Sequence, residues 1–187
     1  MLFSVNALSQ TWAPSGATWH YRADGGYYVF TYSGDTVLSF VNCKVIEKRF
    51  IFDNSWGTGI DTLTNYEYMY ADTDRVYIYR FNAFQVLYDF SAVVGDTLTV
   101  PGTNHYTGCD STGLVRVDTT GTMVINGQTL RFYSVHHIGT TGWGWNTRIV
   151  EKVGPIYNYS VAATAYFLPV KMDYCGMLPD EISEGGP

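Results

Sequence analysis

The chain has 187 residues, of which 46% are hydrophobic and 17% aromatic, and its formal net charge is −6. This apolar content is enough for a packed core and excludes a disordered chain. The negative charge and the small number of basic residues, 11 Lys and Arg in all, exclude a phosphate-binding surface, so nucleic acid is not an expected partner.

Residues 1–10 form a short apolar run followed by small residues. This pattern resembles the tail of a secretory signal peptide, and the alternative is a disordered N-terminus. No apolar run in the chain approaches the roughly 20 residues that a membrane-spanning helix needs. We therefore expect residues 1–10 to lie outside the folded domain, and we expect no membrane span.

Short segments rich in Tyr, Val, Thr, Phe and Ile follow one another through residues 11–179, separated by turn signals such as Asp-Gly and Asn-Gly. No segment combines an apolar period of 3.6 with capping residues, so we expect little helix. The pattern predicts a single all-β domain of antiparallel hairpins, either a β-sandwich or a partly open β-barrel, with a flexible C-terminal end at 180–187. The expected strands are 17–22, 27–32, 36–40, 42–52, 62–71, 75–80, 84–90, 93–100, 113–118, 122–125, 128–135, 146–153 and 160–168.

One hairpin pattern occurs twice without a gap, at residues 34–44 and 121–131. In the second copy, Asn126-Gly127 is the residue pair that favours a tight type I′ turn. The first copy has Ser39-Phe40 at the same position, so we expect a wider loop there. The shared residues are turn and strand residues without catalytic groups, and the repeat therefore indicates scaffold rather than a site.

Histidines and cysteines are the usual ligands of a metal, and the chain has seven of them: His20, His105, His136, His137, Cys43, Cys109 and Cys175. Adjacent His136 and His137 point to opposite faces of a strand, so they cannot both bind one metal ion. The cysteines lack the Cys-x-x-Cys spacing of zinc sites. They allow one disulfide, whose pairing the sequence leaves open. We expect no metal and no cofactor.

Two short motifs also invite a chemical interpretation. Asp72-Thr73-Asp74 spaces its carboxylates as some calcium loops do, but Arg75 follows where such a loop needs further acids. We expect an ordinary turn there, because Asp favours turns through side-chain bonds to the backbone. His105 and Cys109 share a loop, yet nothing marks them as base and nucleophile. No catalytic residue is therefore assigned.

Four acidic residues lie on predicted strands: Glu47, Glu67, Asp89 and Glu151. A glycoside hydrolase needs two carboxyl groups about 5–10 Å apart, and nothing in the sequence brings two of these together. Because most Asp and Glu side chains stay in water, we expect solvated strand faces. Glu67 alternates with Tyr66, Tyr68 and Tyr70, which places it on the face opposite the tyrosines.

Three tryptophans, Trp56, Trp143 and Trp145, lie in Gly-rich segments at 53–61 and 139–145. In an extended segment, Trp143 and Trp145 would point to the same side. Exposed aromatic rings of this kind stack on sugars or anchor a protein partner. These residues are the predicted binding residues, and the alternative is that their rings cap the open end of the β-core.

Several further motifs together resemble one group of exported proteins: Thr11-Trp12-Ala13-Pro14, Gly34-Asp35-Thr36, Asp74-Arg75-Val76-Tyr77, Leu87-Tyr88-Asp89-Phe90 and Ile149-Val150-Glu151-Lys152. Over about residues 11–187 the chain is similar to a β-rich module of secreted Bacteroidetes-type proteins. In such proteins the module precedes a C-terminal type IX secretion sorting domain. The resemblance implies export and a secreted or cell-surface location. It implies no particular activity.

The sequence thus predicts a secreted or cell-surface module, without catalytic activity, that binds a glycan or a surface protein. One alternative is a secreted hydrolase acting on an extracellular polymer, with a carboxylate pair drawn from Glu67, Asp89 and Glu151. The other is a structural spacer before a sorting domain. The oligomeric state stays open.

Overall fold

The computed structural model describes residues 12–23, 26–53, 59–101, 112–138 and 147–156. These residues form antiparallel strands in two sheets and contain no helix, which confirms the predicted all-β fold. None of the described segments is therefore a helix that could cross a membrane. The first sheet consists, in order, of β1 (Thr18–Ala23), β2 (Gly26–Leu38), β3 (Val41–Asp53), β4 (Ile60–Ala71), β5 (Arg75–Arg80) and β6 (Ala83–Asp89). The second consists of β7 (Thr97–Pro101), β8 (Thr112–Ile125), β9 (Gln128–His137), β10 (Thr147–Val150) and β11 (Gly154–Ile156).

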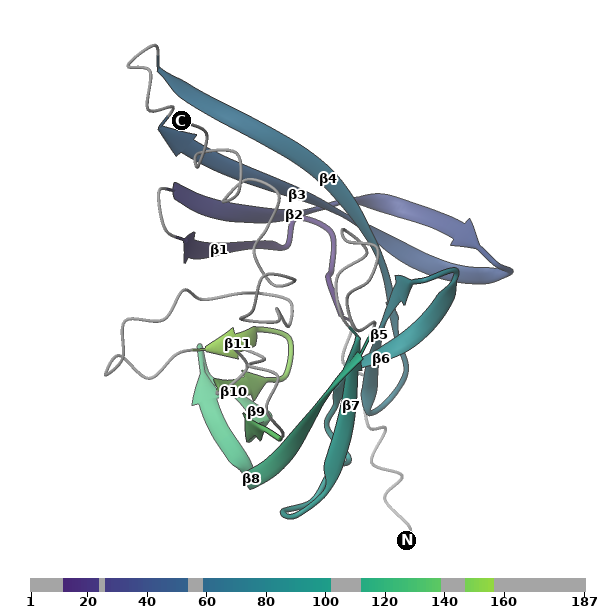
Figure 1. Cartoon of the computed structure of the whole chain (residues 1–187), viewed down its shortest axis with the longest axis vertical. Coiled ribbons are helices and arrows are strands. Elements are labelled where there is room, and N and C mark those ends of the chain that lie inside the picture. Colours follow the sequence, from purple (N-terminus) through teal and green to yellow (C-terminus); the bar gives the residue numbers. More distant parts are fainter. Residues whose placement is uncertain (1–11, 24–25, 54–58, 102–111, 139–146, 157–187) are drawn as a thin grey trace, which may run out of the picture.

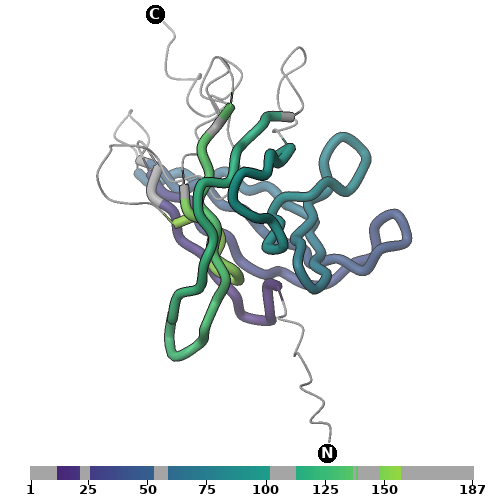
Figure 2. Tube along the Cα trace, turned by 90° about the horizontal axis from the view of Figure 1, so that it is seen from below, coloured from purple at the N-terminus to yellow at the C-terminus, as the bar shows by residue number. Residues whose placement is uncertain are grey.

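Within each sheet, every strand pairs with its neighbours in the sequence, so both sheets are simple meanders (Figures 1 and 2). One of the sheets curls into a half-barrel. Side chains join the first strand of the first sheet to the end of the second sheet. Trp19 Nε1 and Tyr21 Oη on β1 donate hydrogen bonds to the carbonyl oxygens of Lys152 and Val153, at 3.2 and 3.1 Å. These bonds hold β1 beside the turn between β10 and β11.

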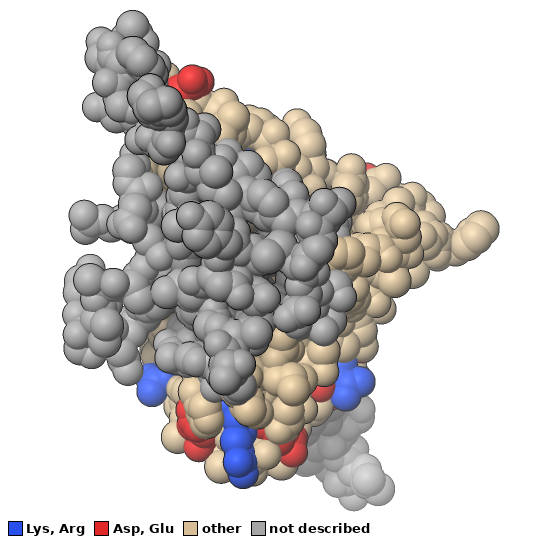
Figure 3. Space-filling view, in the orientation of Figure 1, with Lys and Arg blue, Asp and Glu red and all other residues tan. Residues whose placement is uncertain are grey.

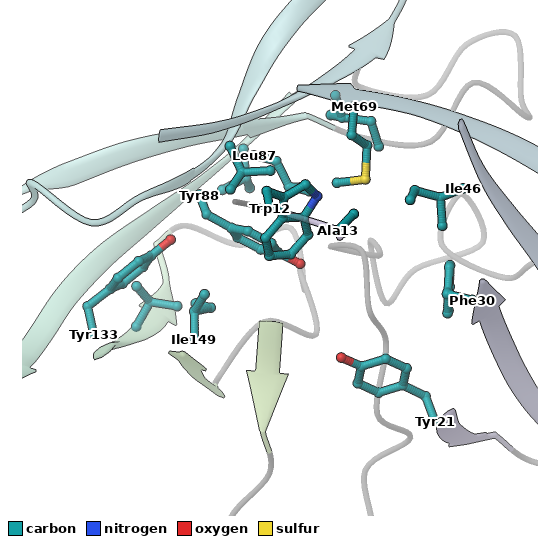
Figure 4. Close-up of a cluster of buried hydrophobic side chains, with 14 of the residues drawn as sticks. Trp12, Ala13, Tyr21, Phe30, Ile46, Met69, Leu87, Tyr88, Tyr133 and Ile149 are labelled. Atoms are coloured by element: carbon teal, nitrogen blue, oxygen red, sulfur yellow. The ribbon is translucent and has the colours of Figure 1, made fainter. Parts of the chain in front are cut away.

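The core lies between the sheets and takes side chains from both (Figure 4). Trp12, which precedes β1, is at its centre: its ring stacks on Trp19 at 5.7 Å and meets the edge of Tyr88 at 5.6 Å. Inward-pointing residues on alternate strand positions surround it, as the period of a β-strand requires. They include Ile46, Met69, Ile78 and Leu87 from the first sheet and Val115, Tyr133 and Ile149 from the second.

Two of the predicted turns are β-bulges inside longer strands. The expected turn at 33–35 lies within β2, where the register shifts between Tyr32 and Gly34, and the expected break after residue 118 is a shift between Val117 and Thr119 in β8. Gly34 has φ +150°, a conformation that glycine adopts without a Cβ penalty, so the extra residue fits without ending the strand. A bulge and a turn use the same residue types, which explains the wrong prediction.

The end of the described chain also differs from the prediction. The expected strand at 146–153 ends early, because Lys152 takes a left-handed conformation with φ +63° and turns the chain. Gly154-Pro155 begins the short strand β11, which pairs with β10. The strand expected at 160–168 lies outside the described residues.

The repeated pattern forms the same two-residue hairpin in both copies. Ile125 pairs with Gln128 across Asn126-Gly127, and Leu38 pairs with Val41 across Ser39-Phe40. The wider loop expected at Ser39-Phe40 is therefore wrong. Both residues have positive φ, +50° and +64°, as a type I′ turn requires. The pairing of the flanking strands imposes a left-handed conformation on Phe40, whose side chain is fully exposed at 104%.

Replacing Ser39-Phe40 by Asn-Gly is expected to raise the free energy of unfolding by about 1–2 kcal/mol, because a left-handed conformation costs an ordinary residue about that much. The measurement is urea denaturation followed by circular dichroism. The matched control is the reverse exchange of Asn126-Gly127 for Ser-Phe, which should lower the stability by a similar amount. An Asn-Gly variant no more stable than the parent would show that the turn at Phe40 is unstrained.

Candidate functional site

The predicted binding residues Trp56, Trp143 and Trp145 lie outside the described residues, and so do His105, Cys109 and Cys175. Cys43, the described cysteine, is a free, buried thiol whose Sγ lies 3.6 Å from the carbonyl oxygen of Thr36. Burial raises the pKa of this thiol, which keeps it protonated and unreactive at neutral pH. The candidate functional residues that the structure describes therefore lie on the strands and in the turns between them.

Three of the four strand acids are buried, against the expectation of solvated faces: Glu67, Asp89 and Glu151, with 5%, 8% and 5% of their surfaces exposed. Each is paired with a different arginine. Glu67 on β4 receives both terminal nitrogens of Arg80 from β5, one of them at 2.7 Å. A buried charge is tolerated only when it is paired and hydrogen-bonded, so this bidentate pair explains how Glu67 can share the inner face with Met69.

Asp89 ends β6 and anchors the turn that follows. It accepts a hydrogen bond from Arg75 Nε at 2.7 Å and another from the backbone N–H of Ser91 at 2.9 Å. Burial alone would raise the pKa of this carboxyl, but the bonds from Ser91 and Arg75 outweigh it and hold the pKa below its usual value. Asp89 is thus an ionised structural acceptor, which is the opposite of a general acid kept protonated.

The third acid belongs to a cluster that joins the two sheets. Arg131 on β9 bonds to Glu151 Oε1 at 2.8 Å and to Asp74 Oδ1 at 2.6 Å, and Asp74 lies in the turn between β4 and β5. The same guanidinium lies 5.7 Å from the ring centre of Phe90. Its hydrogen bonds with Glu151 raise the pKa of Arg131 further above its already high value. The cluster fixes how the first sheet sits against the second.

A small hollow beside this cluster has a volume of about 20 Å³ and is lined by residues that include Trp12, Asp72, Arg75, Phe90 and Lys152. That is room for about one water molecule. Small-molecule sites typically measure about 300–1,000 Å³. The hollow is therefore too small to hold a substrate.

The expected turn at Asp72-Thr73-Asp74 is confirmed. Asp72 Oδ1 accepts hydrogen bonds from the backbone N–H groups of Asp74 and Arg75, at 3.0 and 2.8 Å, and Oδ2 accepts one from Tyr77 Oη at 3.0 Å. Both oxygens of the Asp72 carboxylate are thus engaged in local hydrogen bonds. Among the described residues, no group of three His, Cys, Asp or Glu side chains could hold a metal ion.

The outer side of the first sheet carries a row of aromatic side chains, which we call the aromatic face: Tyr66, Tyr68, Tyr70, Tyr77, Tyr79 and Phe84. They alternate with buried residues, since Glu67 and Met69 on β4 and Val76 and Ile78 on β5 point into the core. The predicted alternation of Tyr66, Tyr68 and Tyr70 is confirmed. The sequence reasoning missed Phe84, which joins the row through the pairing of β5 with β6.

The rings of the aromatic face pack against one another. Tyr70 and Tyr77 are directly opposite across the β4–β5 ladder and stack in parallel at 4.4 Å, while Phe84 meets the edges of Tyr70 and Tyr79 at 4.9 and 5.1 Å. Partial burial raises the pKa of Tyr70 and of Tyr77, so both hydroxyls remain neutral donors. Tyr66 continues the row with 52% of its surface exposed.

Charged groups border the aromatic face: Glu47 on β3 lies directly opposite Tyr66 and pairs with Arg49 at 3.0 Å, and Asp72 accepts a hydrogen bond from Tyr77. On the face seen in Figure 3, Lys, Arg, Asp and Glu side chains gather at the lower end, whereas the end of the projecting β2–β3 hairpin shows none. The sequence agrees, because residues 36–42 contain no charged side chain. The hairpin tip, with Val37 and Phe40 exposed, is thus a place where described apolar side chains meet water without a charged surround.

No family model, no curated protein and no solved structure matches the chain.

Proposed function

We propose that the chain is a non-catalytic binding module of a secreted or cell-surface protein, and that it binds a glycan or a protein partner through aromatic side chains, of which Tyr66 is exposed and its neighbours on the aromatic face are half-buried. The observation that carries this proposal is the aromatic face, which presents five tyrosines and Phe84 on one side of the sheet. Tyrosine combines a broad apolar ring with a hydroxyl that can donate a hydrogen bond, a combination enriched at binding surfaces.

The buried acids support a binding role over the alternative of a hydrolase. A catalytic pair needs two carboxyl groups that act on one bond, with one of them held protonated. Glu67, Asp89 and Glu151 are each bonded to a separate arginine, and the pKa of Asp89 is lowered rather than raised. These contacts engage all three carboxylates in ion pairs that stabilise the fold.

The loop tryptophans remain part of the proposal. Trp143 and Trp145, with Trp56, would add indole rings to the binding surface, as their spacing in the sequence predicts. Secretion, suggested by the resemblance of residues 1–10 to a signal peptide and of the chain to exported β-modules, would give such a surface access to extracellular polymers.

The variant Tyr66→Ala/Tyr68→Ala is expected to weaken binding about tenfold, because each ring lost from a contact costs roughly 0.5–1.5 kcal/mol. The measurement is affinity gel electrophoresis against soluble β-glucan, xylan and mannan, together with a pull-down of surface proteins. Trp143→Ala/Trp145→Ala tests the loop tryptophans in the same assays.

The matched control is Val124→Ser, which removes another exposed apolar side chain, 69% accessible, from the second sheet. It should leave binding unchanged. All three variants should retain the parent's circular dichroism spectrum. Full binding by both aromatic variants would contradict the proposal.

A further inference from the structure

Most of strand β4 has an open edge. On one side, β4 pairs with β3 from Ile60 to Met69, but on the other side it pairs with β5 only from Met69 to Ala71. In the described part of the chain, no strand pairs with residues 60–68 on the side away from β3. All seven residues 60–66 are exposed, and Figure 1 shows this part of β4 running well past β5 and β6.

This edge lacks the features with which proteins usually block edge pairing, namely lysine, proline, a bulge or very short length. Residues 60–66 contain a single charge, on Asp61, and no Lys, Arg or Pro. The β3–β4 ladder runs from Ile60 to Met69 without a register shift, so the edge is regular. The Thr62 N–H on this strand donates to Asp61 Oδ1 at 2.8 Å. The other N–H and C=O groups that face away from β3, which no described strand pairs with, are a ready template for another strand.

We propose that a second copy of this chain occupies the edge, so that two β4 strands pair antiparallel about a two-fold axis at Leu63. The side chains of residues 60–66 favour this occupant because they are complementary to themselves. In this register Ile60 lies opposite Tyr66 of the second copy, Asp61 opposite Asn65, Thr62 opposite Thr64, and Leu63 opposite Leu63.

Each of these opposing pairs is favourable. Aromatic–β-branched and Thr–Thr pairs are among the stabilising cross-strand combinations, Leu63 meets its own copy in an apolar contact, and the amide of Asn65 can donate to Asp61. Moving the axis one residue along, to Thr64, would put Asp61 opposite Glu67, which is buried and already bonded to Arg80 of β5, so this register is disfavoured. Opposed residues belong to the same face, so the aromatic faces of the two copies would lie on one side of a joined sheet.

A seven-residue ladder is a small interface, so we expect a reversible dimer whose population rises with protein concentration. The test is sedimentation equilibrium of the full chain over a range of concentrations, for the parent and for Leu63→Lys and Leu63→Glu. Each single variant places like charges on the two-fold axis and should raise the dimer dissociation constant at least about tenfold. An equimolar mixture of the two should restore association, because lysine then faces glutamate.

The control is Val124→Lys, which adds the same charge at an exposed position of the second sheet and should leave association unchanged. Restored association in the mixture also shows that both Leu63 variants are folded. A parent protein that stays monomeric at every concentration would overturn the proposal. A dimer that persists unchanged in both Leu63 variants would overturn it too.

Discussion

Replacing Glu67 by leucine is expected to lower the free energy of unfolding by about 3–5 kcal/mol, the usual cost of breaking a buried ion pair. The large effect comes from Arg80, whose side chain is only 11% exposed and whose terminal nitrogens both bond to Glu67. Without the carboxylate, a guanidinium would remain in the core with no counter-charge. Arg80→Met should cost a similar amount, because it leaves the Glu67 carboxyl buried without its partner.

The double variant Glu67→Leu/Arg80→Met is the decisive comparison. It removes both charges at once, so its stability should return close to that of the parent or exceed it. Urea denaturation of the parent, the two single variants and the double variant closes a thermodynamic cycle. A single variant that costs less than about 1 kcal/mol would mean that water reaches the pair, since exposed pairs contribute no more than that.

Tyr133→Ala is expected to destabilise the protein by about 3–5 kcal/mol, as large-to-small substitutions of buried aromatic residues do. Tyr133 is 2% exposed and lies on β9 in the second sheet, where its ring meets Phe90 at 5.6 Å. Its hydroxyl accepts a hydrogen bond from the backbone N–H of Asp89 at 3.4 Å. Truncation would therefore open a cavity where the two sheets meet and leave that N–H without its partner.

Tyr133→Phe separates the two contributions, because it keeps the ring and removes the hydroxyl. It should cost about 1 kcal/mol, the usual net value of one hydrogen bond. Thermal and urea unfolding of both variants provide the measurement. If Tyr133→Phe were as destabilising as Tyr133→Ala, the hydroxyl rather than the packing of the ring would hold the sheets together.

The architecture could be predicted because turn chemistry and alternation are local properties. Asn126-Gly127 and the alternating tyrosines of β4 and β5 determine hairpins and faces without reference to the rest of the chain. The conformation of Ser39-Phe40 could not be predicted in this way. There the ladder between β2 and β3 overrides the preferences of the two turn residues, and the ladder depends on pairing along both strands.

The burial of the acids could not be read from residue type, because it depends on which arginine lies opposite. Glu67 on β4 bonds to Arg80 at the end of the neighbouring strand β5. Glu151, which directly follows β10, bonds to Arg131 on the paired strand β9. A signal was nevertheless present: Glu67 is in phase with Met69 and out of phase with the tyrosines of the aromatic face, so the alternation already placed it on the face opposite to them. The candidate tryptophans are a different case, since only their sequence context supports them.

The meander order of the strands has a consequence for how the molecule folds. Each ladder closes a short loop between neighbouring strands, so hairpins can form one after another with a modest loss of chain entropy. The hydrogen bonds from Trp19 to Lys152 and from Tyr21 to Val153 are exceptions, spanning 133 and 132 residues. We expect these contacts to form last, after the hairpins have assembled, and to be the first to break when the native structure opens.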